Sequence, residues 1–470
     1  MKFFSRLLAT AVFLCVMFAP TFAGTAQSGI QQYAYISYDA PETATVWLID
    51  PSSLETTVLT TISANTGETI GAAFLSPTND WIVVRFTLGQ TASLRLINLS
   101  SGEIANVIDG FAFPLRPNSI GGDFDVFEWS PNGQYFAFFT QVGDEGQTLY
   151  VYNVQTQTLT NIGSPGENQY QLSWSPDGDR LAFVSLACVV SGCTNAVLNV
   201  YDMTRMAAVH AIDLAQFAGN SGTESVNFCE IKWSTDASFI SFFDFCDSSA
   251  FGTPREMQIV DLNSEVITQV TSLTPTDVPP TNSLYNATHD AVWIDSSALL
   301  MGTRFLTGEA YPAAGTVTSY TTLYDRQNQS VSVIDSRRLG RWARANDQLI
   351  AHAVYSYALD SDNSPVLTSS NIEVSSFDGQ ILTRLASGPS GCLLSWIRSA
   401  DILAYIGSDD IAPGGLCEPG FETLHFLTTT HLQSFVVDQG QRAAALGWYT
   451  RSGDLASPTP APTQASGSSG

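Results

Sequence analysis

The chain has 470 residues and a formal net charge of −25, because 44 acidic residues stand against only 19 lysines and arginines. A surface of this charge repels the phosphate backbone of nucleic acids and the anionic face of membranes, so neither is an expected partner. Strong negative charge favours solubility and does not indicate a fold.

The first 26 residues are typical of an export signal. Lys2 and Arg6 give a positive start, the apolar run Leu7–Ala19 follows, and small residues surround position 24. The run has about 13 residues, which is too short to span a bilayer, and no other apolar stretch has membrane length. We therefore expect a signal peptide over 1–26 and a secreted, periplasmic or cell-envelope protein that does not insert into the membrane. Removing the two positive charges leaves a net charge of −27.

Three alternating apolar runs follow between Tyr33 and Thr61 and are typical of β-strands. From there on the chain is repetitive. Segments 127–139 and 172–184 share an apolar residue, a Trp, the turn Ser-Pro-Asn/Asp-Gly and an apolar run, and weaker copies lie on either side. The marker aromatic residues, spaced by about 45 to 60 positions, are Phe74, Trp129, Trp174, Trp233, Trp293, Trp342, Trp396 and Trp448.

Each part of the repeat has a physical reason. Pro fixes φ at the first turn position, Asp or Asn bonds back to the backbone, and Gly accepts a positive φ. The apolar run after the turn is suited to a strand that is buried on both faces. Two further strands follow each motif, for example over 147–154 and 157–161, and the last is the most polar.

Four strands per repeat predict an all-β fold, a β-propeller of four-stranded antiparallel blades, rather than a sandwich. The motif Trp-Ser-Pro-Asp-Gly followed by an apolar strand resembles the TolB-like repeats, which are relatives of the WD-repeat propellers. It is also similar to the propeller domain of dipeptidyl peptidases. That resemblance does not extend to their hydrolase domain, so it implies a propeller and no peptidase activity.

The number of blades follows from the units at the two ends. Seven marked units occupy about 70–437, whereas 33–61 lacks a Trp strand and 443–450 is a Trp strand with nothing after it. Joined together, these two fragments make one more blade, so we expect eight blades with the ring closed by the C-terminal strand. Seven blades are the alternative. The propeller is expected to span 27–454, followed by a disordered Pro/Thr/Ser/Gly tail over 455–470.

Six cysteines remain after the signal, and an even number in an exported chain favours disulfides. Their spacing predicts local pairs: Cys188 with Cys193, Cys229 with Cys246, and Cys392 with Cys417. No Cys/His cluster with zinc spacing occurs.

A search for catalytic and metal-binding motifs yields structural interpretations only. Ser390 lies in Gly-Pro-Ser-Gly, which is not a nucleophile elbow, and His289–Asp290 lacks a third partner. Asp360–Ser364 has the alternating oxygens of a calcium loop, but the required Gly and Glu are replaced by Pro365 and Asn371. We therefore expect no catalytic, cofactor-binding or metal-binding residue.

The leading hypothesis is an exported, monomeric, non-catalytic scaffold that binds another protein or an extracellular ligand. Long insertions at about 187–195, 307–317 and 358–368 are candidate contact regions. The alternative is an enzyme of the glycoside hydrolase or lyase type with its site at the mouth of the central channel, where loops converge.

Overall fold

The computed structural model describes residues 31–112, 127–141, 147–163, 167–189, 192–214, 228–243, 257–270, 285–294, 296–307, 316–335, 341–345, 349–359, 365–376, 381–388, 390–396, 402–408, 423–428, 432–436 and 442–450. Their regular elements are β-strands, which form eight four-stranded antiparallel sheets. Within these ranges, no helix has the length and apolarity needed to cross a bilayer.

The sheets are numbered here in the order in which the chain forms them. Sheet 1 contains β1 (Gln31–Ala40), β2 (Thr43–Ile49), β3 (Thr56–Ser63) and β32 (Arg442–Thr450). Sheet 2 contains β4 (Thr69–Leu75), β5 (Trp81–Leu88), β6 (Thr91–Asn98) and β7 (Ile104–Phe111). Sheet 3 contains β8 (Phe127–Trp129), β9 (Tyr135–Gln141), β10 (Gln147–Asn153) and β11 (Thr158–Asn161). Sheet 4 contains β12 (Glu167–Trp174), β13 (Arg180–Val189), β14 (Gly192–Asp202) and β15 (Ala207–Asp213).

The other four sheets have the same arrangement. Sheet 5 contains β16 (Cys229–Trp233), β17 (Phe239–Phe243), β18 (Met257–Asp261) and β19 (Val266–Gln269). Sheet 6 contains β20 (Tyr285–Trp293), β21 (Ala298–Thr307), β22 (Thr316–Asp325) and β23 (Ser330–Asp335). Sheet 7 contains β24 (Arg341–Ala345), β25 (Leu349–Leu359), β26 (Pro365–Ser376) and β27 (Ile381–Gly388). Sheet 8 contains β28 (Ser390–Trp396), β29 (Leu403–Ser408), β30 (Thr423–Leu427) and β31 (Leu432–Val436).

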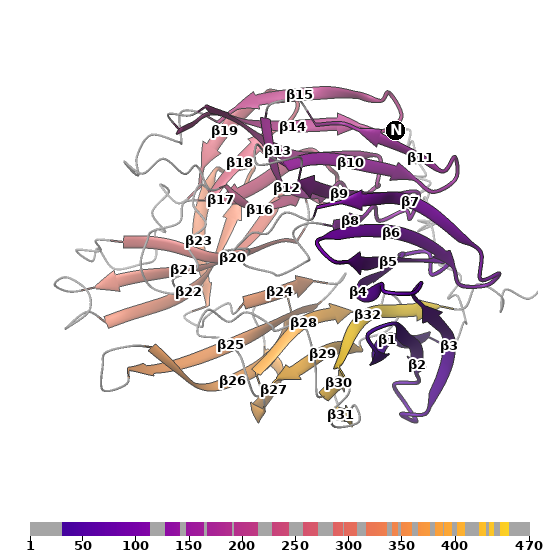
Figure 1. The fold of residues 1–470 in the computed structure, drawn as a ribbon. Helices are drawn as coiled ribbons and strands as arrows, with labels where there is room; N and C mark the ends of the chain where they lie inside the picture. The colour runs from indigo at the N-terminus through magenta and orange to yellow at the C-terminus, as the bar shows by residue number, and fades with distance from the viewer. Residues whose placement is uncertain are drawn as a thin grey trace, which may run out of the picture.

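In sheets 2 to 8 the strands pair in the order in which they follow along the chain. We call the first strand of each of these sheets, together with β32, the inner strands, and the last strand of each sheet the outer strands. The inner strands lie toward the middle of the molecule and the outer strands at its rim (Figure 1). This is the architecture of a β-propeller, and it confirms the expectation of an all-β chain of four-stranded antiparallel sheets.

Sheet 1 differs because its strands come from both ends of the described chain. Its order is β3-β2-β1-β32, and Tyr33 on β1 lies opposite Trp448 on β32. Figure 1 shows the yellow β32 running beside the indigo β1. The segment 442–450 therefore provides the inner strand of the first sheet, which is the pairing that the two incomplete sequence units predict.

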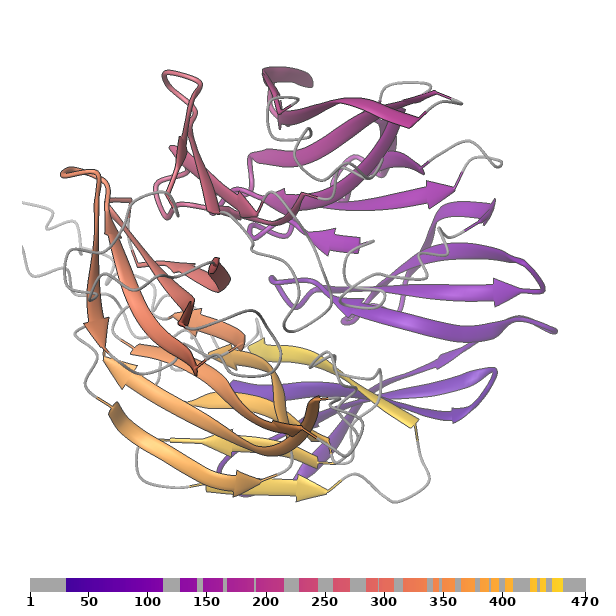
Figure 2. The same ribbon diagram turned by 90° about the vertical axis from the view of Figure 1, so that its left-hand side faces the viewer.

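The hydrophobic core lies between successive sheets rather than in one central mass. Residues of sheets 1 and 2, 2 and 3, 3 and 4, 4 and 5, and 5 and 6 form shared buried clusters. Sheets 6 and 7 touch through β20 and β24, and sheets 7 and 8 through β24 and β28. Sheet 8 packs on sheet 1, where the Tyr33 ring lies 5.7 Å from that of Phe426. The succession of sheets can be followed in Figure 2.

Burial along the strands explains their composition. In β17 all five residues are buried, because both faces of this second strand contact neighbouring sheets. In β31, by contrast, exposed and partly buried residues alternate, as expected for a strand at the rim. The apolar run after each turn and the more polar fourth strand are therefore explained by position in the sheet.

The tight turns after the inner strands have the geometry that the motif predicts. Gly133 and Gly178 have φ of +69° and +77°, and Ala237 takes the same place in sheet 5 with φ of +56°. The Ser175 hydroxyl donates to the Asp177 carboxylate at 2.5 Å, and Ser234 does the same to Asp236 at 2.7 Å. Side-chain bonds of this kind fix such turns.

Phe74 and Trp342 lie before the register position that Trp129 holds at the end of its inner strand. Trp129 ends its inner strand and pairs with Phe136, the second residue of the next strand. In sheet 2 the residue at this register position is Leu75, which pairs with Ile82, so Phe74 lies one residue before it. In sheet 7 the residue at this register position is Ala345, which pairs with Ile350, so Trp342 lies three residues before it. The marker residue and the end of the inner strand therefore differ by one position in sheet 2 and by three in sheet 7.

Candidate functional site on the inner strands

In sheets 3 to 6 the tryptophan that ends the inner strand ties its sheet to the one before it. The indole N–H of Trp129 donates to the Phe74 carbonyl at 3.2 Å, that of Trp174 to the Glu128 carbonyl at 3.1 Å, and that of Trp233 to the Ser173 carbonyl at 2.9 Å. Each acceptor lies one residue before the position that ends the preceding inner strand. The repeated Trp is thus explained by packing combined with one inter-sheet hydrogen bond.

The fourth tie contains an extra hydroxyl. The indole N–H of Trp293 donates to the Ser241 Oγ at 3.0 Å, and this hydroxyl donates in turn to the Lys232 carbonyl at 3.3 Å. Lys232 precedes Trp233, so its carbonyl is the expected acceptor. Ser241 is fully buried, and its hydroxyl relays the bond that the other sheets make directly.

In sheets 3, 4 and 5 the first residue of the strand that follows the turn packs on the tryptophan ring of the next sheet. Tyr135 stacks on Trp174 with ring centres 6.0 Å apart, and Phe239 packs against Trp293 at 6.2 Å. Arg180 takes the same place in sheet 4, and its guanidinium carbon lies 5.2 Å above the Trp233 ring. An arginine can replace an aromatic ring here because its planar cation is attracted to an aromatic face.

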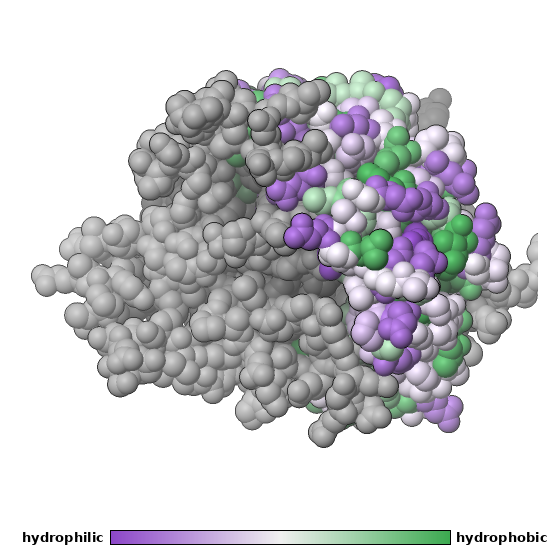
Figure 3. Space-filling view, viewed as in Figure 1, coloured by the Kyte–Doolittle hydropathy of each residue, from purple (hydrophilic) through white to green (hydrophobic). Residues whose placement is uncertain are grey.

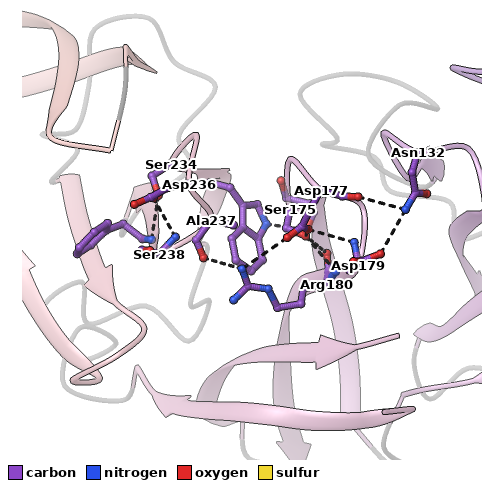
Figure 4. Close-up of polar contacts among 12 residues, drawn as sticks. Asn132, Ser175, Asp177, Asp179, Arg180, Ser234, Asp236, Ala237 and Ser238 are labelled. Carbon is purple, nitrogen blue, oxygen red and sulfur yellow. Dashed lines mark hydrogen bonds and ion pairs between the residues drawn. The ribbon is translucent and has the colours of Figure 1, made fainter. Parts of the chain in front are cut away.

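Polar contacts between neighbouring turns add a second row of ties, which Figure 4 shows. The Asn132 amide of sheet 3 donates to the Asp177 carbonyl of sheet 4 at 3.1 Å and lies 3.4 Å from the Asp179 carboxylate. Arg180 of sheet 4 donates to the Ala237 carbonyl of sheet 5 at 2.9 Å. The carboxylates of Asp177 and Asp236 bond within their own turns, whereas that of Asp179 faces the neighbouring turn.

Several inner strands contain a β-bulge a few residues before the strand ends. At two of them a non-glycine residue has a left-handed backbone, with φ of +52° at Gln171 and +55° at Glu230. The Gln171 side-chain oxygen accepts from the Glu230 N–H at 3.3 Å, so the two bulges contact each other. A bulge redirects a side chain out of the regular alternation and is frequent beside functional sites. The other register shifts on inner strands fall between Ile70 and Ala73, Thr288 and Asp290, Arg341 and Arg344, Cys392 and Ser395, and opposite Ala34 and Tyr35 on β32.

A charged pair lies at the bulge of β16. Lys232 Nζ lies 3.6 Å from the Glu230 carboxylate and donates to the Ala291 carbonyl of sheet 6 at 2.8 Å. The two side chains are 28% and 34% exposed, so the pair is neither buried nor fully solvated. Lys232 is the only lysine in the sequence apart from Lys2. We call Gln171, Glu230 and Lys232 the inner-strand cluster; it offers an amide, a carboxylate and an ammonium group on two adjacent sheets.

The sequence contains little that would reveal this cluster. Gln171 and Glu230 match no motif, and Lys232 lies inside a weak copy of the repeat. The one available signal was the scarcity of lysine, because a single retained lysine in an acidic chain is unusual. Bulges depend on the pairing of two strands and cannot be read from one strand alone.

Two buried histidines lie elsewhere, on the central strands of sheets 7 and 8. His425 stacks on Tyr405 with ring centres 4.7 Å apart, and its Nδ1 lies 2.8 Å from the Ser434 hydroxyl. Burial lowers the pKa of His425 to about 4 and raises the pKa of Tyr405 to about 12. His352 lies 3.4 Å from the Glu373 carboxylate, and both side chains are buried. These groups lie within the sheets, away from the inner strands.

The predicted disulfides and loops are described only in part. Cys188 lies directly opposite Cys193 in the β13–β14 register. Cys229 lies opposite Phe243, whereas Cys246 lies outside the described residues. Cys392 is on β28, and Cys417 is also outside the described residues, as are 1–30, the acidic loop 360–364 and 451–470. All three disulfides remain predictions.

His289 and Ser390 fall on inner strands. His289 lies at the register shift of β20, and Ser390 begins β28. Among the residues that the structure describes, no group of three or more His, Cys, Asp or Glu side chains is placed to hold a metal ion.

No protein-family profile and no curated protein matches the chain. Solved structures similar to it include TolB from Acinetobacter baumannii, with 14% identity and a TM-score of 0.31, covering 65% of this chain and 63% of TolB. Prolyl oligopeptidase B from Galerina marginata has 14% identity and a TM-score of 0.42, covering 82% and 51%. Oligogalacturonate lyase from Vibrio parahaemolyticus has 10% identity and a TM-score of 0.44, covering 89% and 97%.

These structures include TolB, the family that the repeat motif resembles. The chain spans less than two thirds of the length of TolB and about half of the prolyl oligopeptidase. All three TM-scores lie below 0.5.

Proposed function

We propose that the chain is an exported, non-catalytic β-propeller over 27–454 that binds a protein or an extracellular ligand. One observation carries the proposal: the recurring residues, which are the Trp, the turn Ser and the turn Asp or Asn, are occupied in ties between or within sheets. They provide no recurrent reactive group. What remains on the inner strands of sheets 4 and 5 is the inner-strand cluster, a polar surface suited to recognition.

The proposed ring has eight blades and is closed by β32. Supporting it, Trp448 of β32 contacts both Tyr33 of sheet 1 and Phe426 of sheet 8, with ring centres 5.2 and 5.9 Å apart. Closure of this kind removes the exposed strand edge that β1 would otherwise present.

Truncation tests the closure. A chain ending at Gln439 lacks β32, and its matched control ends at Asp454 and lacks only the tail. We expect the control to melt like the full chain and the shorter chain to lose cooperative thermal unfolding, as monitored by circular dichroism. A shorter chain that melts at the temperature of the control would show that the ring does not depend on β32.

Binding is tested with the purified protein as bait in an extract of the cell envelope and culture medium. Variants Glu230→Gln and Lys232→Met remove the charges of the inner-strand cluster, and Glu103→Gln, on the exposed turn before β7, is the control. We expect a partner retained by the wild type and the control to be lost with both cluster variants. Equal retention by all variants would place the binding surface elsewhere.

One observation favours the alternative, a propeller enzyme. Glu230 is a half-buried carboxylate on a strained backbone, beside an ammonium group, and acid–base catalysis uses such carboxylates. A screen of glycans, esters and peptides decides between the two. Turnover that disappears in Glu230→Gln, while the melting curve is unchanged, would replace the scaffold proposal with the enzyme.

Export is part of the proposal and is tested by cell fractionation with peptide mapping of the N-terminus. We expect the protein outside the cytoplasm, with an N-terminus near residue 27. Cytoplasmic protein that retains Lys2 would contradict it.

A further inference from the structure

The outer strands of the sheets have one open edge, and an open edge can pair with another chain unless it is protected. Charged side chains, short length and bulges are the usual protections. Of the outer strands in the described residues, β11, β19 and β31 are short, with four, four and five residues. The longer ones, β7, β15, β23 and β27, each carry a charged residue: Asp109, Asp213, Asp335 and Arg384 respectively.

β3 is the exception. Its eight residues, Thr-Thr-Val-Leu-Thr-Thr-Ile-Ser, include no charged residue and no proline, and β-branched residues dominate. Val58 is 55% exposed, and Thr56, Thr57, Thr61 and Ser63 are exposed as well. Among the described residues one bulge, at Leu59, is its only protection of these kinds, and the pairing with β2 continues beyond it to Ser63.

The segments that flank β3 are acidic, and Arg95 of sheet 2 is paired with Glu68, whose carboxylate also accepts from the Asn65 N–H beyond the strand. Glu55 directly precedes the strand, and Glu42 lies at its other end, where its carbonyl accepts from the Ala64 N–H at 2.8 Å. Both glutamates are exposed. Between residues 7 and 84 the sequence contains no lysine or arginine, so none lies on β1, β2, β3 or β4.

We propose that β3 is a docking edge for an extended segment of another protein, which adds a fifth strand to sheet 1. Backbone hydrogen bonds to the open edge provide affinity, and alternate side chains provide specificity. The incoming segment has β-branched residues in its middle and basic residues at both ends, because Glu42 and Glu55 flank the edge.

A second copy of the chain fits this edge poorly. Two β3 strands that paired with each other would bring acidic ends together in either orientation, between two molecules of strong negative charge. The occupant is therefore a different, basic chain. The inner-strand cluster is not part of this docking edge, so binding at β3 can be tested independently of the proposed function.

The probe is a synthetic peptide, Arg-Thr-Val-Thr-Val-Thr-Arg, titrated into the full-length protein at low ionic strength. Its acidic counterpart, Glu-Thr-Val-Thr-Val-Thr-Glu, is titrated in parallel. Two further basic peptides carry backbone N-methyl groups on alternate residues, one on the odd and one on the even positions. In an added strand only one of these two sets donates to β3. We expect the basic peptide to bind, the acidic peptide not to bind, and one N-methylated peptide to lose binding while the other keeps it.

Variants of the protein locate the contact. Val58→Lys places a positive charge on the edge, and Val266→Lys on β19, where the valine is 57% exposed, is the matched control. We expect Val58→Lys to weaken the basic peptide by roughly tenfold and the control to leave it unchanged, while both variants melt like the wild type. Three results would each overturn the proposal. The two lysine variants could weaken the basic peptide equally, the two N-methylated peptides could bind equally, or the acidic peptide could bind. Concentration-dependent dimerisation suppressed by Val58→Lys would instead identify a second copy as the occupant and overturn it too.

Discussion

The buried ring of His425 makes the stability of the protein depend on pH in a defined direction. In the folded chain its pKa is about 4, because burial disfavours the charged form. The exposed imidazole of the unfolded chain titrates near 6.5. Between these two values the unfolded state binds the extra proton, so stability rises with pH across the window. The stabilisation is complete above about pH 6.5 and is lost as the pH falls toward 4.

The magnitude follows from the difference between the two pKa values. About 2.5 pH units at 1.36 kcal/mol per unit give on the order of 3 kcal/mol. The surroundings of His425 explain why the free energy of protonating its buried ring is not offset. His425 Nε2 is buried and has no hydrogen-bond partner among the described residues, while Nδ1 contacts the Ser434 hydroxyl and the ring lies on Tyr405. A proton added at Nε2 would therefore be a buried charge without a partner.

The assay is urea unfolding at pH 7.0, 5.5 and 4.5 for the wild type and for His425→Gln, which is neutral throughout. His210→Gln is the control, because His210 is partly exposed and lies 3.0 Å from the Glu265 carboxylate. We expect the variant to be less stable than the wild type at pH 7, and this difference to shrink by roughly 2–3 kcal/mol toward pH 4.5. A difference that stays constant over the three pH values would refute the reasoning.

Three further predictions concern the ties within and between sheets. Trp174→Phe removes the bond to the Glu128 carbonyl and part of a buried ring, so thermal melts should show a loss of roughly 1–3 kcal/mol; an unchanged melt would mean that the inter-sheet bond contributes nothing. Arg95 donates two hydrogen bonds to Glu68 and lowers the pKa of that carboxyl, so the pair stabilises the fold above that pKa and is lost in acid. Glu68→Gln should therefore cost roughly 1–3 kcal/mol at pH 7 and less near pH 3, measured by urea unfolding; equal costs at both pH values would contradict this. Cys188 and Cys193 should appear as one disulfide-linked pair in non-reducing peptide maps, since they lie opposite each other on paired strands, and a link from either to another cysteine would contradict it.

Most of the fold could be predicted from the sequence, because turn chemistry and apolar alternation are local. Ser175 and Asp177 fix their turn through contacts between near neighbours, so the motif alone locates it. Register is different, because it is decided by two strands together. Leu75 and Ala345 occupy tryptophan positions without being aromatic, and only their partners on the next strand reveal them.

The candidate site was less predictable than the fold. Glu230 and Gln171 have left-handed backbones, a conformation that their residue types do not predict. Lys232 donates to a carbonyl 59 positions away in the sequence. The open edge of β3 follows from the strand order of sheet 1, in which β3 pairs with β2 on one side only. Composition alone shows an uncharged strand, and only the pairing order shows that the strand has one free side.

The pairing of β1 with β32 has a consequence for the order of events in folding. The tie between Trp129 and the Phe74 carbonyl joins residues 55 positions apart, whereas Tyr33 and Trp448 are separated by about 415. Bringing the more distant pair together costs about 2 kcal/mol more chain entropy at 25 °C, since that cost grows with the logarithm of the loop length. Sheets 2 to 8 can each form from contiguous chain, but sheet 1 must wait for its last strand, and refolding should show this as a late, slow phase.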